Sequence, residues 1–210
     1  MGNQLHTSLL HSWQGIDDAA RLDTATINLE PGRLSAHGTS RTDEYAMSWA
    51  LTTTEGWVTR RLTATVHGHG WSRHLDLDRS DDGVWSSTTH SSGECPLPGA
   101  GIDDPSSLTG ALDCDLGLCP VTNTMPILRL NLHSEELAPA DETSMAMAWV
   151  EVPSLRVVRS QQMYSQLRAP SEDRNGVILY SSDNHGFTAE LQIDRDGIVV
   201  EYPGLATLTG

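Results

Sequence analysis

The feature that most constrains the fold is a series of short β-type segments that recurs along most of the chain. Residues 58–66 and 71–77 combine β-branched, aromatic and alternating apolar side chains, which is typical of strands with one buried face. Turn signals separate neighbouring segments, as at Asp81-Asp82-Gly83 and at residues 194–197. Similar segments occur at 34–38, 45–51, 83–85, 145–152, 155–167, 177–181, 187–193 and 198–202. Because no alternating helical pattern accompanies them, we expect a mainly β fold with one long antiparallel sheet.

One short helix is predicted at residues 122–130. Thr122 is a suitable N-cap, and Pro126 lies near the first turn. The apolar residues of this segment are spread around most of the helix, which indicates burial on many sides. Residues 86–107 are rich in Gly, Pro and Ser and are predicted to form a long surface loop, while 135–143 reads as an acidic connector. Neither stretch marks a boundary, so a single domain spanning 1–210 is expected.

The segment 111–130 is unusual because it carries polar groups inside an apolar run. Asp113 and Asp115 flank Cys114, so on a strand both would point to the same face. Removing an unpaired amide or hydroxyl from water costs about 2–7 kcal/mol. The segment therefore lies either in a satisfied polar network or beside a cavity.

Two interpretations of these residues stay open. The two carboxylates could bind the hydroxyl groups of a sugar or act in acid–base chemistry. Alternatively they support the fold, by bonding the end of the helix or by pairing with Arg60 or Arg129. Asn123 and Thr124 at the start of the helix allow the same two interpretations, which differ in whether empty volume lies beside them.

Aromatic and polar side chains elsewhere supply further candidates. Gln162 and Tyr164 share one face of a predicted strand, and Tyr202 lies near the terminal strand, so the three could form a polar rim. Tryptophans could stack on sugar rings or simply fill the core, namely Trp49, Trp57, Trp71, Trp85 and Trp149.

The charge of the chain excludes several classes of partner. The net charge is −15, and all thirteen basic residues are arginine. Nucleic acids and anionic membrane surfaces require a basic surface that this composition lacks. The sequence contains no run of about 18 apolar residues, so no transmembrane helix is predicted. The first residues do not resemble a secretory signal, so we expect a cytoplasmic protein.

No cofactor or metal is predicted. His67 and His69 have a spacing that a metal could use, but no convincing further ligands accompany them. Cys95, Cys114 and Cys119 are expected to be free thiols, since their spacing fits neither a zinc site nor a disulfide framework.

Several local motifs occur along the chain, namely LDCDL at 112–116, PVTNTMPILRL at 120–130, VPSL at 152–155, QMY at 162–164, DRDGIVVEYPGL at 194–205 and WVTR at 57–60. In order and spacing, these motifs together resemble a bacterial family described as "putative glycolipid-binding" proteins. The resemblance implies a spiral β-roll, in which a long antiparallel sheet winds around one central buried helix.

From the resemblance and the residues together we predict non-enzymatic binding of a glycolipid or another amphipathic ligand inside the roll. No catalytic residue is predicted. The candidate ligand-binding residues are Asp113, Asp115, Asn123, Thr124, Arg129, Arg60, Trp57, Gln162, Tyr164 and Tyr202. Two alternatives belong to other classes: a hydrolase or isomerase that uses the Asp113/Asp115 pair, and a ligand-free scaffold that pairs through an exposed sheet edge.

Overall fold

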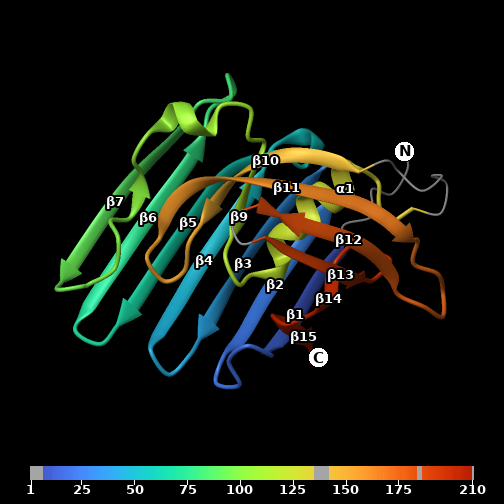
Figure 1. The fold of residues 1–210 in the computed structure, drawn as a ribbon, viewed down its shortest axis with the longest axis horizontal. Helices are drawn as coiled ribbons and strands as arrows, with labels where there is room; N and C mark the ends of the chain where they lie inside the picture. Colours follow the sequence, from blue (N-terminus) through green and yellow to red (C-terminus); the bar gives the residue numbers. More distant parts are fainter. Residues whose placement is uncertain (1–6, 135–141, 184–185, 210) are drawn as a thin grey trace.

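The computed structural model describes residues 7–134, 142–183 and 186–209, and strands dominate it (Figure 1). The first seven strands are β1 (Thr7–Gly15), β2 (Leu22–Glu30), β3 (Arg33–Arg41), β4 (Tyr45–Thr53), β5 (Thr59–Gly68), β6 (Trp71–Arg79) and β7 (Trp85–Gly93). The later strands are β8 (Gly101–Ile102), β9 (Asp113–Leu116), β10 (Thr143–Val150), β11 (Arg156–Arg168), β12 (Gly176–Ser182), β13 (Phe187–Ile193), β14 (Val199–Tyr202) and β15 (Ala206–Leu208). The short helical elements are η1 (Glu55–Trp57), η2 (Pro105–Leu108), η3 (Pro120–Asn123) and α1 (Thr124–Arg129).

All of these strands belong to one sheet, which is not closed into a barrel. Its order is β7-β6-β5-β4-β3-β2-β1-β15-β14-β13-β12-β11-β10-β9, and β8 pairs with β11 off this path. The first and last strands meet in the middle of the sheet, where Trp13 of β1 lies opposite Leu208 of β15. Residues from the two ends of the sequence therefore become neighbours.

The sheet is mixed, so the expectation of a wholly antiparallel sheet was wrong. β9 pairs with β10 in parallel, and β8 pairs with β11 in parallel. Parallel neighbours need a crossover connection instead of a hairpin. For β9 and β10 that crossover contains η3 and α1, the elements that the sequence marked as helical.

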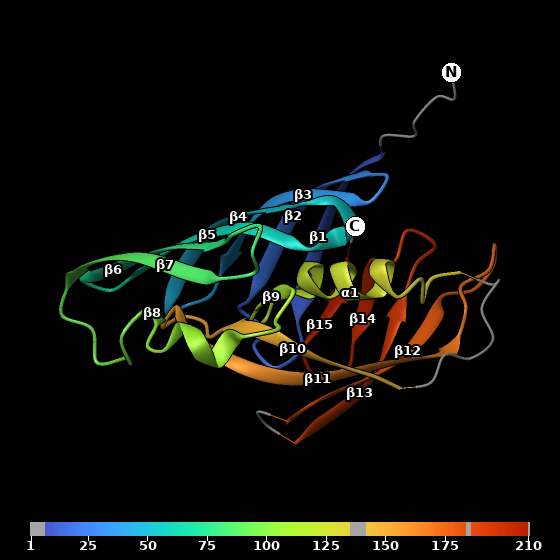
Figure 2. The ribbon, with the colours of Figure 1, turned by 90° about the horizontal axis from the view of Figure 1, so that it is seen from above.

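The helix α1 lies between two parts of the bent sheet. Figure 2 shows β1–β5 on one side of α1 and β10, β11 and β13 on the other. Met125 and Leu128 pack into the larger apolar core, while Ile127 packs into a second core cluster that includes residues of β11–β14. The prediction of a helix buried on many sides is thus confirmed.

The start of the helix differs from the prediction. Residues Pro120–Asn123 form the 3-10 helix η3, and the α-helix begins at Thr124. Thr122 does not cap it, because the N-cap position is Asn123 and no side chain there bonds to the helix. The single hydroxyl proton of Thr122 is shared between Asp115 Oδ1 at 2.9 Å and the carbonyl oxygen of Cys119 at 3.0 Å. The side chain that was predicted to cap the start of the helix therefore bonds to a carboxylate instead.

Alternating burial confirms the period-two pattern in the predicted strands. In β4 every second residue is buried, and the residues between them are exposed; the buried ones are Tyr45, Met47, Trp49 and Leu51. The prediction of a surface loop at 86–107 is partly wrong, because the first residues of this stretch belong to β7, which ends at Gly93. Most of the predicted acidic connector, residues 135–141, lies outside the described residues. Within the described ranges, no helix has the length and apolar character needed to cross a membrane.

Candidate functional site

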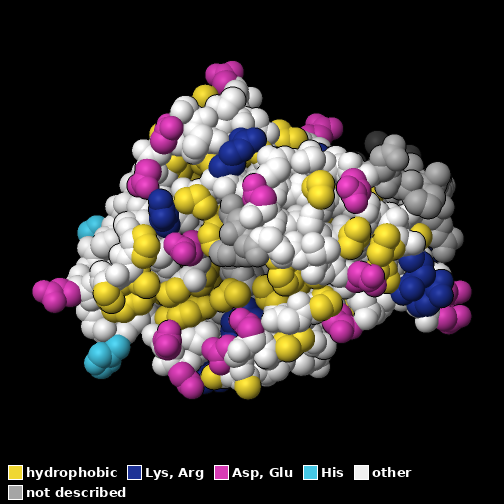
Figure 3. Space-filling view, in the orientation of Figure 1, with side chains coloured by type: hydrophobic (Ala, Val, Ile, Leu, Met, Phe, Trp, Pro, Cys, Tyr) yellow, Lys and Arg dark blue, Asp and Glu magenta, His cyan; other side chains and the backbone are white. Residues whose placement is uncertain are grey.

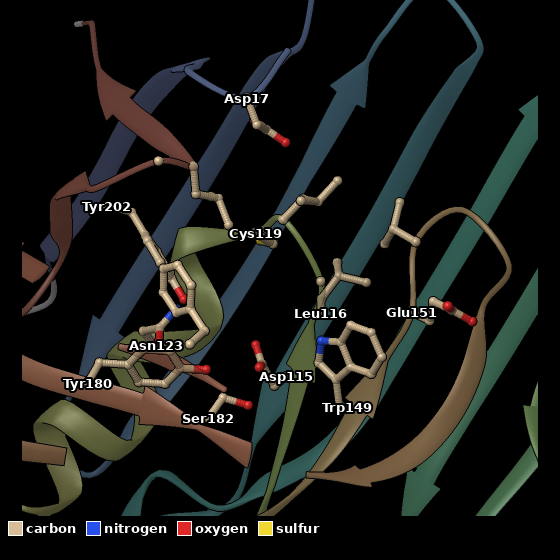
Figure 4. Close-up of a pocket in the computed structure, with 16 residues that line it drawn as sticks. Asp17, Asp115, Leu116, Cys119, Asn123, Trp149, Glu151, Tyr180, Ser182 and Tyr202 are labelled. Carbon is tan, nitrogen blue, oxygen red and sulfur yellow. The ribbon is translucent and has the colours of Figure 1, made fainter. Parts of the chain in front are cut away.

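A cavity of about 410 Å³ lies where the segment after β9 faces β10 and the C-terminal strands (Figure 4). This volume falls within the roughly 300–1,000 Å³ of small-molecule sites. Its apolar walls are formed by Leu116, Leu118, Val152, Phe187 and Leu205, with the ring of Trp149. Its polar lining consists of Asp17, Asp115, Asn123, Glu151, Tyr180, Ser182 and Tyr202, together with Cys119 and backbone at Gly117 and Gly204. Figure 3 shows, on one face, a hollowed band of apolar side chains flanked by acidic groups.

The carboxylate of Asp115 points into this cavity (Figure 4). Gln162 Nε2 donates to Asp115 Oδ2 at 2.6 Å, and Thr122 Oγ1 donates to Oδ1 at 2.9 Å. Within the described part of the chain no basic side chain forms an ion pair with Asp115. Burial raises the pKa of Asp115, the two hydrogen bonds oppose this shift, and the charge of Asp113 adds to it. Neutral donors therefore hold Asp115 in place and leave its charge uncompensated.

Two buried side chains behind the cavity orient these donors. Gln162 and Tyr164 are about 1% exposed. The hydroxyl of Tyr164 lies 3.0 Å from Gln162 Oε1 and 2.9 Å from Asn123 Oδ1, and can donate to either oxygen. This contact sets which way the Gln162 amide points, so that its nitrogen faces Asp115. Gln162 and Tyr164 thus support the site from outside the cavity, whereas Asn123 also lines it.

Aromatic rings form one wall of the site. Tyr180 packs edge-on against Tyr164 and Tyr202, with ring centroids 5.1 and 5.9 Å apart. Phe187 lies 5.9 Å from the ring of Tyr202 and continues the wall. Burial raises the pKa of Tyr180 and of Tyr202 well above the ordinary value, so their hydroxyls stay protonated and able to donate hydrogen bonds.

Asp113 has a different partner from Asp115, although both lie on one face of β9. Arg129 Nη1 donates to Asp113 Oδ1 at 2.7 Å, and Nη2 contacts Oδ2, which makes a bidentate ion pair. The Asp113 side chain is 1% exposed and does not line the cavity. Burial raises the pKa of Asp113, while Arg129 opposes the shift. The pair links β9 to the end of α1.

Three other candidates lie away from the cavity. Thr124 is fully buried, and its hydroxyl has no partner among the described residues. Trp57, in η1, packs against the larger core. Arg60 is exposed and donates to the carbonyl of Arg79 at 2.9 Å, with Asp81 at 3.6 Å.

The structure therefore divides the predicted set into groups. Asp115, Asn123 and Tyr202 line the cavity, Gln162 and Tyr164 bond to lining residues, and Asp113 and Arg129 form the neighbouring ion pair. Thr124, Trp57 and Arg60 do not join them.

The sequence interpretation missed Tyr180, Ser182 and Phe187 as lining residues. Tyr180 and Ser182 belong to β12, and Phe187 begins β13, far along the chain from Asp115. A usable signal was present, since Phe187 is the single phenylalanine and Tyr180 sits in a predicted strand. Only the bend of the sheet brings them to β9.

The part of the chain that the structure describes contains no group of three or more His, Cys, Asp or Glu side chains placed to hold a metal ion. His67 and the exposed His69 lie at the end of β5 and in the turn that follows. Cys95, Cys114 and Cys119 are free thiols, as expected.

Comparison with known proteins agrees with this architecture. The fold is similar to that of a DUF1089 family protein from Pseudomonas aeruginosa, with 24% identity, a TM-score of 0.64, and coverage of 88% of this chain and 91% of that one. No curated protein matches the chain. Residues 11–207 match the family described as "Putative glycolipid-binding", and this match spans nearly the whole sheet, the helix and the cavity. The chain is therefore a member of that family.

Proposed function

We propose that this protein binds an amphipathic ligand, of the glycolipid class, in the cavity beside Asp115 and does so without catalysis. The observation that carries the proposal is one cavity of about 410 Å³ that joins an apolar wall to a set of fixed polar groups. Such a combination is typical of sites that bury the body of a ligand and orient its polar end.

The two parts of the cavity have distinct roles in this proposal. An alkyl chain that packs against Val152, Phe187 and Leu205 would be removed from water. This transfer would favour binding by about 25 cal/mol for each Å² of apolar surface buried. Hydroxyl groups of the head group would bond to Asp115 and to neutral groups such as Asn123 and Tyr180.

The proposed binding mode depends on the shape of the sheet. We take the bend of the sheet around α1 to be a spiral roll, formed by one domain, with its interior open beside the helix. The placement of α1 between the two core clusters supports this interpretation, since packing on both sides fixes the helix and leaves the space next to η3.

The geometry does not favour the alternative of a hydrolase or isomerase. A paired-carboxylate mechanism places both groups beside one reacting bond. Asp113 has both oxygens bonded to Arg129 and lies outside the cavity lining, so Asp115 would act alone.

Native mass spectrometry of protein purified from its own host, followed by organic extraction, tests the proposal. We expect a stoichiometric adduct that is released as an amphipathic molecule. The Leu205→Trp variant fills the cavity and is expected to lose the adduct, whereas Leu167→Trp is the matched control because Leu167 is half-exposed on β11. Retention of the same adduct by Leu205→Trp, or a clean apo mass for the wild type, would count against binding in this cavity.

A further inference from the structure

We propose that the cavity accepts a head group that is uncharged and rich in hydroxyls and that it rejects anionic lipids, with Asp115 as the discriminating residue. This inference rests on the proposed function and deepens it, because it specifies the charge of the head group and the residue that selects for it.

The first argument is the sign of the charge that lines the cavity. Three lining residues are acidic, namely Asp17, Asp115 and Glu151, and none of the lining residues is Arg, Lys or His. Arg21 pairs with Asp17, so of these three charges those of Asp115 and Glu151 have no ion-pair partner among the described residues. Asp115 is the innermost of the three, since it points to the centre of the cavity while Asp17 is 40% exposed at the edge (Figure 4). A carboxylate, phosphate or sulfate bound there would face a negative charge across a poorly hydrated space.

The second argument is that the buried arginines nearby are already engaged. Arg21 is 1% exposed, and its terminal nitrogens donate to Asp17 Oδ1 at 2.5 Å, to the carbonyl of Leu118 at 3.1 Å and to the carbonyl of Leu205. Its Nε–H has no partner among the described residues, but this nitrogen is buried and Arg21 does not line the cavity. Arg129 is bonded to Asp113 through both terminal nitrogens. Recognition of an anion needs donors of this type with free N–H groups directed at the ligand, and neither guanidinium lines the cavity.

The third argument is the match between the remaining polar groups and hydroxyls. Tyr180 and Tyr202 carry hydroxyls, and Asn123 carries an amide, so each can donate and accept. Gln162 and Thr122 occupy one site on each oxygen of Asp115, and a carboxylate oxygen accepts at about two sites. One free acceptor site on each oxygen can then receive an O–H of the ligand. A polyol supplies such donors, whereas an anionic head group supplies only acceptors.

The test compares two ligands with the same nonyl chain at pH 7.5, n-nonyl β-D-glucoside and decanoate, by isothermal titration calorimetry below their critical micelle concentrations. We expect the glucoside to bind at least ten-fold more tightly than decanoate. In Asp115→Asn the affinity for the glucoside is expected to fall about five-fold, because one acceptor is lost. The affinity for decanoate is expected to rise about ten-fold, because one repulsive charge is removed.

Asp81→Asn is the control for the change in net charge. Asp81 lies in the β6–β7 turn with its side chain 94% exposed, outside the cavity, so this variant should keep the wild-type ratio of affinities. Asn can replace Asp115 without loss of the fold, because its oxygen can accept from Gln162 and its nitrogen can donate to the hydroxyl of Thr122.

Each outcome separates the inference from the proposed function. Decanoate that binds the wild type as tightly as the glucoside, with both blocked by Leu205→Trp, would overturn the inference and leave the binding function intact. If Asp115→Asn does not change the preference for the glucoside, Asp115 is not the residue that discriminates between the two head groups. If neither ligand binds and the host-purified protein carries no adduct, the proposed function fails first.

Discussion

At the scale of single residues, the two carboxylates of β9 illustrate how neighbours in sequence acquire different environments. Asp113 is neutralised by Arg129, whereas Asp115 is held by the neutral donors Gln162 and Thr122. A charge held only by neutral groups in a partly buried position costs stability, and such costs are typical of sites shaped for binding.

The Asp113–Arg129 pair gives the first prediction. Arg129→Met leaves a buried carboxylate without its partner and is expected to lower the free energy of unfolding by about 3–5 kcal/mol. The double variant Asp113→Leu/Arg129→Met removes both charges and should recover most of this loss, since the Met side chain at position 129 can pack beside Met145. Urea denaturation measures both values. A double variant as unstable as the single one would contradict this account.

Asp115 gives a prediction about pH. Burial raises its pKa in the folded state, so the folded protein holds this proton more tightly than the unfolded chain. Its contribution to stability is present below the unfolded pKa and is lost as pH rises through the folded pKa. The stability of Asp115→Asn relative to wild type should therefore increase between pH 4 and pH 7, measured by urea denaturation at each pH. Asp81→Asn is the charge control. If the difference in stability between Asp115→Asn and wild type does not rise with pH more than that of Asp81→Asn, the pKa of Asp115 is not raised.

At the scale of elements, close contact between strands is decided at a few positions. In β3, a Cβ on Gly38 would lie 2.3 Å from the carbonyl oxygen of Thr24 and 2.7 Å from Trp49 Cζ2. Trp49 sits directly opposite Gly38 on β4, so the absence of a side chain makes room for its ring. The glycine is required for this cross-strand packing.

Gly38→Ala is expected to lower the free energy of unfolding by about 2–3 kcal/mol, because backbone at Thr24 cannot move away without disturbing the β2–β3 pairing. Gly99→Ala is the matched control, since a Cβ there meets no atom within 4 Å and the stability should stay within about 0.5 kcal/mol of wild type. Thermal or urea unfolding measures both. Equal effects of the two substitutions would show that the contact with Trp49 is not limiting.

Also at this scale, β7 explains where reading strands from sequence fails. After Trp85 its residues are mostly exposed, and they are mainly Ser and Thr. Strand signals depend on one buried apolar face, and an edge strand with little burial does not carry that signal. The strands predicted at 45–51 and 187–193 were recognised because alternate residues of each are apolar, and these residues are buried in β4 and largely buried in β13.

At the scale of the whole molecule, the sheet connects both ends of the sequence and α1 connects both core clusters. β1 pairs with β15, and side chains of α1 contribute to the cluster over β1–β7 and to the one over β11–β14. Neither half of the sheet can lose its packing without exposing the helix.

We therefore expect the two halves to unfold together. Native-state hydrogen exchange, followed by mass spectrometry, should give the most protected amides of β3–β6 and of β11–β13 the same opening free energy within about 1 kcal/mol. The contacts of α1 are the physical reason. Opening of β11–β13 at a clearly lower free energy than β3–β6 would show that the halves are separate cooperative units.

Much of the fold and part of the site could be read from the chain alone. Period-two alternation located most strands. The apolar residues spread around the predicted helix at 122–130 located the buried helix α1, because both patterns depend on neighbours within a few residues. The same reasoning singled out Asp115 and Asn123, as polar groups in an apolar run. Arg60 was selected as a possible partner of the carboxylates and Trp57 as a possible stacking ring, and both have partners away from the cavity.

The amino-acid pattern therefore predicts the type of most elements and the burial of their faces. Tertiary packing is what makes β9 run parallel to β10, pairs Arg129 with Asp113 rather than with Asp115, and brings Tyr180, Ser182 and Phe187 to Asp115 around a cavity. The physical reason is that periodicity reports the environment of one segment, whereas a cavity is the volume that distant segments leave unfilled when they pack.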